Sequence, residues 1–309
     1  MEIFKLNTTY DFISKFPGAV KLSIFLIVIS LGSLFYHGGP NWGVEFTGGT
    51  ELQVKFPQGP EVQFIKQSLA GQGYEAEAVQ QFGLASDHEY LISFSPKVVS
   101  FDQIQDFKQK LNEVIGTTPE FAEAQIQRID YIGPKIGKEL VQKAVLSILL
   151  ACVGILIYLV FRFELGFAVG AVIALFHDTI ITLGAISIMD KEFTLAIVAA
   201  LLTVIGYSVN DTIVIFDRIR ENMAKSLQKN FGTIVNEGIS QTLSRTILTG
   251  VTVFIVLIPL FFLGGSVIHD FAFTLIVGVL IGTYSSIFVA SSFVVYWRKR
   301  KAAAAVQDS

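Results

Sequence analysis

Six long apolar runs divide the chain, and short polar or charged breaks separate most of them. A hydrocarbon core about 30 Å thick needs about 20 mostly apolar residues of α-helix, so each run is long enough to cross a bilayer. The pattern therefore predicts a polytopic α-helical membrane protein. Its six predicted transmembrane helices cover Ala19–Tyr36, Ala144–Phe161, Leu165–Met189, Thr194–Phe216, Thr246–Leu263 and Phe271–Tyr296.

Lysine and arginine residues predict the orientation of these spans, because cytoplasmic loops carry an excess of both. With six spans, most of the positively charged segments fall on one face, which the rule assigns to the cytoplasm together with both termini. The long polar segment then lies outside, where its length overrides its own lysines. The predicted order is a cytoplasmic N-terminus (1–18), a first span (19–37), an external segment (38–143), five further spans (144–297) with a cytoplasmic loop (217–245), and a cytoplasmic tail (298–309).

The external segment 38–143 has the periodicity of a small folded domain with its connector. Apolar and polar residues alternate as in strands in several places, and apolar residues recur at helical spacing in two. The order β-α-β-β-α-β is that of the α+β ferredoxin-like fold. The expected strands are Val44–Phe46 with Glu51–Phe56 around Gly48 and Gly49, then Tyr74–Phe82, Glu89–Phe94 and Phe121–Ile129, and the expected helices are Glu61–Ala70 and Phe101–Ile115.

Composition agrees with a membrane protein and narrows its function. Of 309 residues, 52% are hydrophobic and 16% are charged, whereas soluble domains average about 25% charged residues. The net charge of −3 is too small to indicate nucleic-acid binding, and the single cysteine, Cys152, excludes an internal disulfide. The external segment contains no His/Cys cluster, nucleophile motif or phosphate-binding loop. We therefore expect neither an enzyme nor a bound metal or cofactor, and we expect this domain to contact a polypeptide or a partner subunit.

The most informative polar residue is Asp211, which lies inside the fourth predicted span. A carboxylate at membrane depth costs about 2.5–3.5 kcal/mol on insertion scales, and such groups usually face a partner or a water path. Neighbouring polar residues suggest water access: Tyr207, Ser208, Asn210 and Thr212. Asp211 is therefore a candidate proton site, and the competing interpretation is an acid that is simply hydrogen-bonded between helices.

Two further sets of polar residues are candidates for the same path. Arg245 begins the fifth span, where an arginine anchor is expected in any case, although a side chain turned inward would approach Asp211. His177 and Asp178 lie in the middle of the third span, which is unusual for two ionisable residues. Adjacent residues on a helix point about 100° apart, so we expect the two not to face one spot and favour an interhelical structural role over a direct relay.

Several motifs resemble those of a known family. They are Gly43–Leu52 after the first span, Phe161–Glu164 followed by His177-Asp178, Gly206–Thr212 continuing through Phe216–Glu221, and Thr242–Thr246. The motifs occur in the order typical of the SecF members of the SecD/SecF family of protein-export membrane proteins, and the chain is similar to these proteins from about residue 10 to residue 297. The family belongs to the resistance-nodulation-division superfamily.

The resemblance implies a partner, SecD, which supplies six related spans. It implies that the SecDF complex uses the proton motive force, with the proton as coupling ion, to assist preprotein translocation at the SecYEG channel after the SecA step, with YajC as a further associated protein. It also implies a bacterial inner-membrane location with residues 38–143 in the periplasm. The family's proton-path Asp and Arg correspond to Asp211 and Arg245 here, with Ser208, Asn210, Thr212, His177 and Asp178 as supporting polar residues.

Two alternatives remain. The first is a structural scaffold that holds SecD near the channel without conducting protons. The second is a subunit of a small-molecule or lipid exporter of the same superfamily, although about 100 external residues leave little room for a ligand tunnel.

Overall fold

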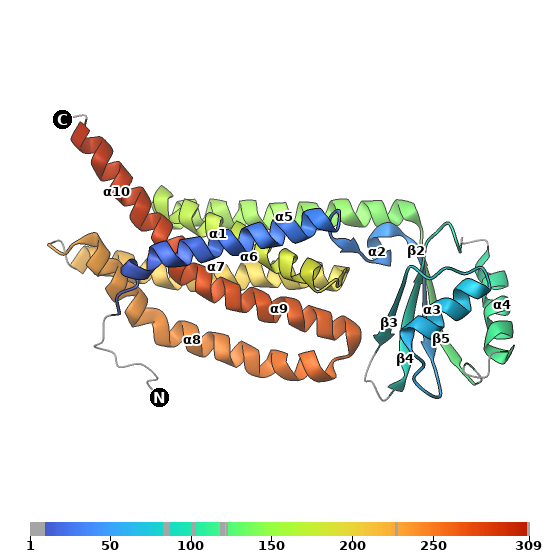
Figure 1. Cartoon of the computed structure of the whole chain (residues 1–309). Helices are drawn as coiled ribbons and strands as arrows, with labels where there is room; N and C mark the ends of the chain where they lie inside the picture. Colours follow the sequence, from blue (N-terminus) through green and yellow to red (C-terminus); the bar gives the residue numbers. More distant parts are fainter. Residues whose placement is uncertain are drawn as a thin grey trace.

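A long helical bundle and a small α/β domain at one of its ends make up the chain in our computed structural model (Figure 1). The structure describes residues 10–82, 87–99, 103–117, 121, 123–225 and 228–307. Within these residues six helical segments are long and apolar enough to cross a membrane, which confirms the predicted fold class. They are built from α1 (Phe16–Tyr36), α5 (Pro134–Arg162), α6 (Leu165–Ile188), α7 (Leu195–Lys225), α8 (Phe231–Leu263), and α9 (Gly265–Ser285) continued by the π-helical η5 (Ser286–Ala290) and α10 (Ser291–Gln307).

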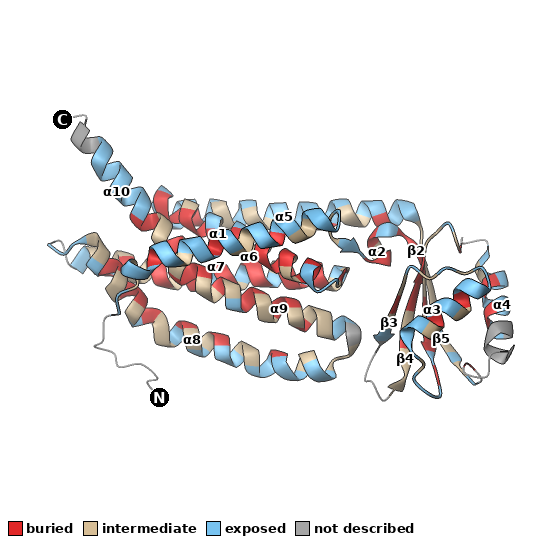
Figure 2. Ribbon diagram, in the orientation of Figure 1, coloured by how far each residue is buried: buried red, intermediate tan, exposed pale blue. Residues whose placement is uncertain are grey.

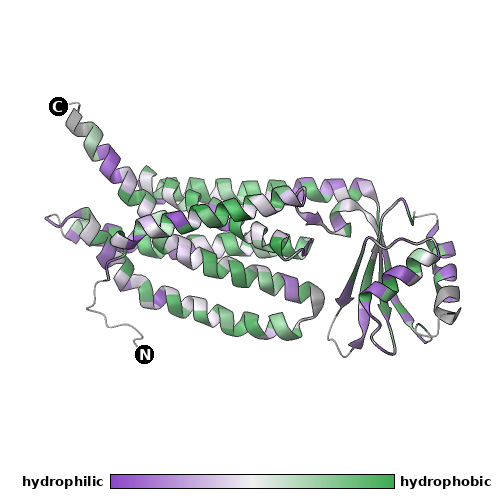
Figure 3. Ribbon diagram, in the orientation of Figure 1, coloured by the Kyte–Doolittle hydropathy of each residue, from purple (hydrophilic) through white to green (hydrophobic). Residues whose placement is uncertain are grey.

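Helices α6 and α7 form the interior of the bundle. Figure 2 shows buried residues concentrated on these two helices, whereas α1, α5 and α8 keep large exposed faces. Those exposed faces are apolar (Figure 3), as expected for side chains in contact with lipid rather than water. The polar side chains on the buried faces of α6 and α7 are therefore removed from the lipid. A short 3-10 turn, η1 (Ile13–Lys15), leads into α1.

The segment 217–245 is helical over most of its length. Helix α7 continues to Lys225 and α8 begins at Phe231, where the Asn230 side chain accepts a hydrogen bond from the Gly232 amide at 2.9 Å and caps the helix. At 1.5 Å per residue, the 31 residues of α7 extend about 46 Å. This exceeds the hydrocarbon thickness of about 30 Å, so both helices project beyond the membrane.

The small domain has the predicted β-α-β-β-α-β order. Its elements are β2 (Gly49–Lys55), α3 (Val62–Gly71), β3 (Ala78–Phe82), β4 (Glu89–Phe94), α4 (Ile104–Thr117) and β5 (Gln125–Ile132). The strands form an antiparallel sheet in the order β3-β4-β2-β5, which confirms the ferredoxin-like arrangement. The predicted start of the second helix, Phe101, lies outside the described residues. The core between sheet and helices includes Leu52, Ile65, Leu69, Ile92, Phe94 and Phe107.

The prediction of a strand at Val44–Phe46 is wrong. These residues form a single helical turn, α2 (Val44–Thr47), whose apolar residues pack toward α5 rather than into a sheet. Gly48 and Gly49 follow with φ angles of 75° and 143°, which only glycine adopts readily. A Cβ on Gly48 would lie 2.8 Å from the Cα of Pro134. The pair of glycines therefore allows β2 to start directly beside the first residue of α5.

The small domain is attached to the bundle at several points. Gly137 of α5 lies so close to α2 that a Cβ there would sit 2.5 Å from the Phe46 carbonyl oxygen. The two-residue strands β1 (Asn41–Trp42) and β6 (Glu192–Phe193) pair in parallel, and Trp42, Phe46 and Phe193 pack ring against ring. Since β6 joins α6 to α7, the small domain contacts the end of the two interior helices.

Candidate functional site

Asp211 is buried in the middle helix of the bundle. Its relative exposure is 3%, and it lies on α7 between the apolar neighbours Val209 and Ile215, which are also buried. Carboxylate oxygen Oδ2 has no hydrogen-bond partner among the residues that the structure describes. Asp211 therefore lies inside the bundle, and its Oδ2 lacks the hydrogen bond expected of a purely structural buried acid.

Helix register places Thr246 of α8 opposite Asp211. Ile219 packs on Gly238, and the Tyr207 hydroxyl lies 3.5 Å from the position of a Cβ on Gly250. These two contacts are twelve residues apart along each helix, in opposite directions, so α7 and α8 run antiparallel with a constant register. Moving one turn from Tyr207 to Asp211 then leads from Gly250 to Thr246. The Thr246 hydroxyl is likewise buried and without a partner among the described residues.

Arg245 precedes Thr246 and interacts electrostatically with Asp211. The described side chains show no ion pair within 4 Å for either residue. Asp217, the next carboxylate along α7, binds Arg162 at 2.8 Å. The Arg245 side chain is exposed, and its charge influences Asp211 without a direct contact.

The other polar residues around Asp211 in sequence point elsewhere. Ser208 donates a hydrogen bond to Asp178 Oδ2 at 2.6 Å, and Thr212 shares one with Ser286 at 2.8 Å. Asn210 is exposed on the outside of the bundle. Because a helix turns about 100° per residue, a polar stretch in sequence is spread around the axis. The expected polar patch is therefore divided between the interior and an open face of α7.

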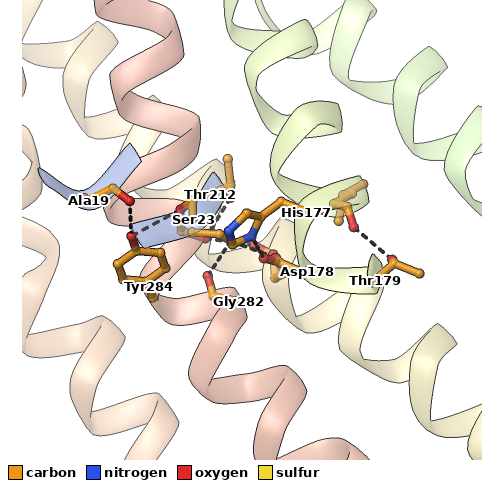
Figure 4. Close-up of polar contacts among 12 residues, drawn as sticks. Ala19, Ser23, His177, Asp178, Thr179, Thr212, Gly282 and Tyr284 are labelled. Atoms are coloured by element: carbon orange, nitrogen blue, oxygen red, sulfur yellow. Dashed lines mark hydrogen bonds and ion pairs between the residues drawn. The ribbon is translucent and has the colours of Figure 1, made fainter. Parts of the chain in front are cut away.

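His177 and Asp178 contact each other, contrary to the expectation that they do not share one spot. His177 Nδ1 lies 2.8 Å from Asp178 Oδ1, since both side chains bend toward the gap between their directions. Asp178 Oδ2 accepts hydrogen bonds from Ser208 and from Ser285, the latter at 2.7 Å. Figure 4 shows the imidazole between Asp178 and Tyr284 of α9, with the two rings stacked at 6.1 Å between centroids.

Sequence reasoning missed the serine residues of the sixth span. Ser285, Ser286 and Ser291 are all fully buried, and they lie in or beside the π-helical segment η5. The Ser286 hydroxyl contacts Thr212, and Ser291 donates to the Ser286 carbonyl at 3.0 Å. Two pairs of serines within a hydrophobic span, Ser285-Ser286 and Ser291-Ser292, were the signal available in the sequence.

A second group of ionisable residues lies at the junction of the two parts. Burial, followed by the nearby carboxylates of Glu45 and Asp130, raises the pKa of Glu51 to about 7. Burial also raises the pKa of Glu192 to about 7, with Glu51 and Glu45 adding to the effect. The Glu45 carboxylate accepts a hydrogen bond from the Leu195 amide at the start of α7, although burial still raises its pKa. Neither this group nor any other set of three or more His, Cys, Asp or Glu residues within the described ranges has the geometry of a metal site.

These carboxyl groups make stability depend on pH. Their folded pKa of about 7 exceeds the ordinary value of 4.5, so the stabilisation is full below pH 4.5 and is lost as the pH rises through 7. For one such group the free energy of unfolding should fall by roughly 2–3 kcal/mol between pH 5 and pH 8. The thermal unfolding midpoint in detergent, measured as a function of pH, reports this loss of stability. Glu51→Gln and Glu192→Gln should weaken the dependence of the midpoint on pH, whereas Glu61→Gln, at an exposed position, should not. An equal dependence on pH in all three variants would contradict the assignment of the effect to Glu51 and Glu192.

Family models match two parts of the chain. "Protein export membrane protein SecD/SecF, C-terminal" matches residues 113–300, and "SecD/SecF GG Motif" matches residues 34–58. The chain is 46% identical over 294 residues to protein translocase subunit SecF of Magnetococcus marinus, which covers 95% of this chain and 94% of that one. It is 42% identical over 293 residues to SecF of Vibrio alginolyticus, covering 94% and 90%.

Solved structures show the same likeness. The crystal structure of SecDF, a translocon-associated membrane protein from Thermus thermophilus, superposes with a TM-score of 0.85 at 33% identity. A SecDF structure in a super-membrane-facing form superposes with a TM-score of 0.74, also at 33% identity. These matches cover 96% and 99% of this chain, but the chain spans only about 40% of the length of either SecDF protein.

Proposed function

Because the chain belongs to the SecD/SecF family of protein-export membrane proteins, we propose that it is a translocase subunit that couples proton movement to preprotein movement. The observation that carries the proposal is Asp211, a buried carboxyl group with an unpartnered oxygen in the central helix. Arg245 acts on it from the start of the next span. Ionisable groups at membrane depth that lack a structural partner are candidates for proton carriage.

The proposed mechanism starts from the charge of Asp211. A proton bound there removes the negative charge and with it the attraction that orients Arg245. The relative position of α7 and α8 then no longer depends on that attraction, and the helices can repack. Motion at the other end of α7 reaches the small domain through β6 and β1 and through Glu45, which binds the first turn of α7. In this way, binding of a proton at Asp211 moves the small domain, which we place in the periplasm beside the emerging preprotein.

A face of α7 is open for a partner with its own spans. The residues exposed along it are Ala199, Thr203, Gly206 and Asn210, which follow helical spacing and include Asn210 beside the proton site. Small and polar side chains are the usual surface for helix association in membranes. We propose that SecD covers this face in the bacterial inner membrane, with both termini of the chain in the cytoplasm. SecYEG, YajC and the preprotein are then expected near the small domain.

Replacing Gly206 with leucine tests this interface. A Cβ on Gly206 meets nothing within 4 Å, so Gly206→Leu leaves the bundle intact but separates the α7 face from SecD. We expect at least about a tenfold decrease in the amount of SecD that copurifies, because overpacking an interface costs about 1–3 kcal/mol. Gly154→Leu on α5, where the same space is open, is the matched control. Unchanged copurification with Gly206→Leu would place SecD on another face.

The proposed function is tested in vesicles that contain SecYEG, SecA, SecD and this chain. Preprotein movement is measured with an imposed proton gradient and again after an ionophore has removed it. Stimulation by the gradient that requires both this chain and SecD supports the proposal. Equal stimulation with and without this chain would mean that the chain is a scaffold or that the protons cross through another protein.

A further inference from the structure

The imidazole of His177 has an unusual environment for a residue at membrane depth. His177 and Asp178 are 3% and 1% exposed. Nitrogen Nδ1 faces Asp178, but Nε2 is buried without a hydrogen-bond partner among the described residues. Two serine hydroxyls donate to Asp178 Oδ2, an arrangement that an ionised carboxylate satisfies. With Asp178 ionised, Nδ1 carries the ring proton, and Nε2 presents a lone pair with no donor facing it.

We propose that Nε2 of His177, oriented by Asp178, is a second proton-binding site of the membrane bundle. A carboxylate that accepts from one ring nitrogen fixes the tautomer and compensates the charge created when the other nitrogen binds a proton. The step is balanced: a proton taken from water converts the neutral ring to an imidazolium beside the Asp178 carboxylate, and its return restores the neutral ring. The inference rests on the proposed function, because the site would serve the same proton movement.

The groups that face the ring come from each helix packed around it. Tyr284 of α9 stacks on it and donates its hydroxyl to the Ala19 carbonyl of α1 at 2.7 Å. Ser23 of α1 contacts the same hydroxyl at 3.1 Å. From α7, Ser208 reaches Asp178, and Asp211 lies one turn further along. On α5, Cys152 packs in a separate cluster with Leu175, Ile205 and Val209.

Three serines of α1 face α6 between this position and the end of the bundle that carries the small domain. Gly184 of α6 packs directly on Ser30 of α1, and Ser187 contacts Ser33 at 2.9 Å. The same parallel register places Ser23 at the level of His177. Beyond Ser187 the row ends at His37, which is exposed and lies 3.3 Å from the Ser187 hydroxyl. Serine therefore recurs on the face of α1 that packs on α6, at Ser23, Ser30 and Ser33, between the level of the imidazole and the surface.

Nitrogen-15 spectroscopy of the histidine rings tests the site directly. The chain has four histidines, so the ring signals of the complex with SecD in vesicles can be assigned with His177→Gln. We expect one proton, on Nδ1, at alkaline pH and protons on both nitrogens at acidic pH. A ring that keeps one form from about pH 5 to about pH 9, or that carries its single proton on Nε2, would overturn the proposal.

A transport measurement separates proton binding from a structural role. Glutamine at position 177 can still donate to Asp178 but cannot take up a proton, so His177→Gln should reduce gradient-dependent preprotein movement about tenfold or more. Thr179→Val, on the same helix, removes a hydroxyl that donates to the Leu175 carbonyl of α6 and is the matched control, expected to retain the response. Equal assembly with SecD is verified for each variant. Full activity of His177→Gln would show that the residue is only structural.

Asp211→Asn in the same vesicles distinguishes this inference from the proposed function. If Asp211→Asn loses the response while His177→Gln keeps it, the second site is wrong and the proposed function stands. If Asp211→Asn keeps the response and His177→Gln loses it, the histidine is the proton site and the role of Asp211 is wrong. If both variants keep it, both proposals fail.

Discussion

Asp211→Asn abolishes the stimulation of preprotein movement by a proton gradient, while movement driven by SecA alone continues at its normal rate. Asparagine has nearly the same shape as aspartate and removes only the ionisable oxygen, so α7 keeps its packing. We expect a loss of about tenfold or more, because groups that transfer protons contribute about 10²- to 10⁴-fold to the steps they serve. The measurement is translocation into vesicles at equal assembled amounts of the complex.

Asn210→Asp is the informative control for this change. It moves a carboxyl group by one position onto the exposed face of α7, where Thr246 and Arg245 do not face it. In the Asp211→Asn background it restores the charge of the helix but not the site, so the response should remain absent. Recovery in the double variant would mean that α7 needs a carboxylate but not the position of Asp211.

Gly184→Leu is expected to have the largest effect on stability. A Cβ at this position would overlap Ser30, so a leucine must push α1 away from α6. Overpacking costs about 1–3 kcal/mol, and for a chain of this size about 3 kcal/mol corresponds to a decrease of roughly 6–12 °C in the unfolding midpoint. The separation of α1 also breaks the contacts of Ser33 with Ser187 and of Ser23 with Tyr284.

Gly32→Leu is the matched control on the same pair of helices. Gly32 is exposed on α1, and a Cβ there meets nothing within 4 Å. This leucine points to lipid and should leave the unfolding midpoint unchanged or slightly higher, since leucine favours a helix over glycine by about 0.5–1 kcal/mol. Similar losses in both variants would mean that the effect comes from the helix itself and not from the contact with Ser30.

Most of the fold could be predicted because membranes simplify the problem. A span must satisfy its own backbone hydrogen bonds and must be about 20 apolar residues long, so hydrophobic runs identify the helices. The small domain follows from its alternating patterns for a similar reason. The one-turn helix α2 was missed because Val44 and Phe46 alternate with polar residues as in a strand, and only the packing of α5 shows that the chain turns there.

The candidate site was predicted in part. Asp211 is evident from sequence because a carboxylate is costly in a membrane, whereas Thr246, Ser285 and Tyr284 are ordinary residues whose importance depends on register. Helix register and rotation arise from packing between distant segments, such as Ser30 on Gly184 or Tyr207 on Gly250. For the same reason, the sequence suggested that Ser208 and Thr212 surround Asp211, but the helix directs them toward Asp178 and Ser286.

Proton release from vesicles during translocation tests the central claim most directly. Inverted vesicles containing SecYEG, SecD and this chain enclose a pH-sensitive dye in an acidic lumen, which corresponds to the periplasmic side of the complex. SecA, ATP and a preprotein are added outside, on the cytoplasmic side, so the gradient drives protons out of the vesicles. The account predicts that preprotein movement accelerates proton flux and that Asp211→Asn removes this acceleration without changing the passive leak. Acceleration of equal size in the variant would contradict it, because the coupled protons would then cross without the Asp211 carboxyl group.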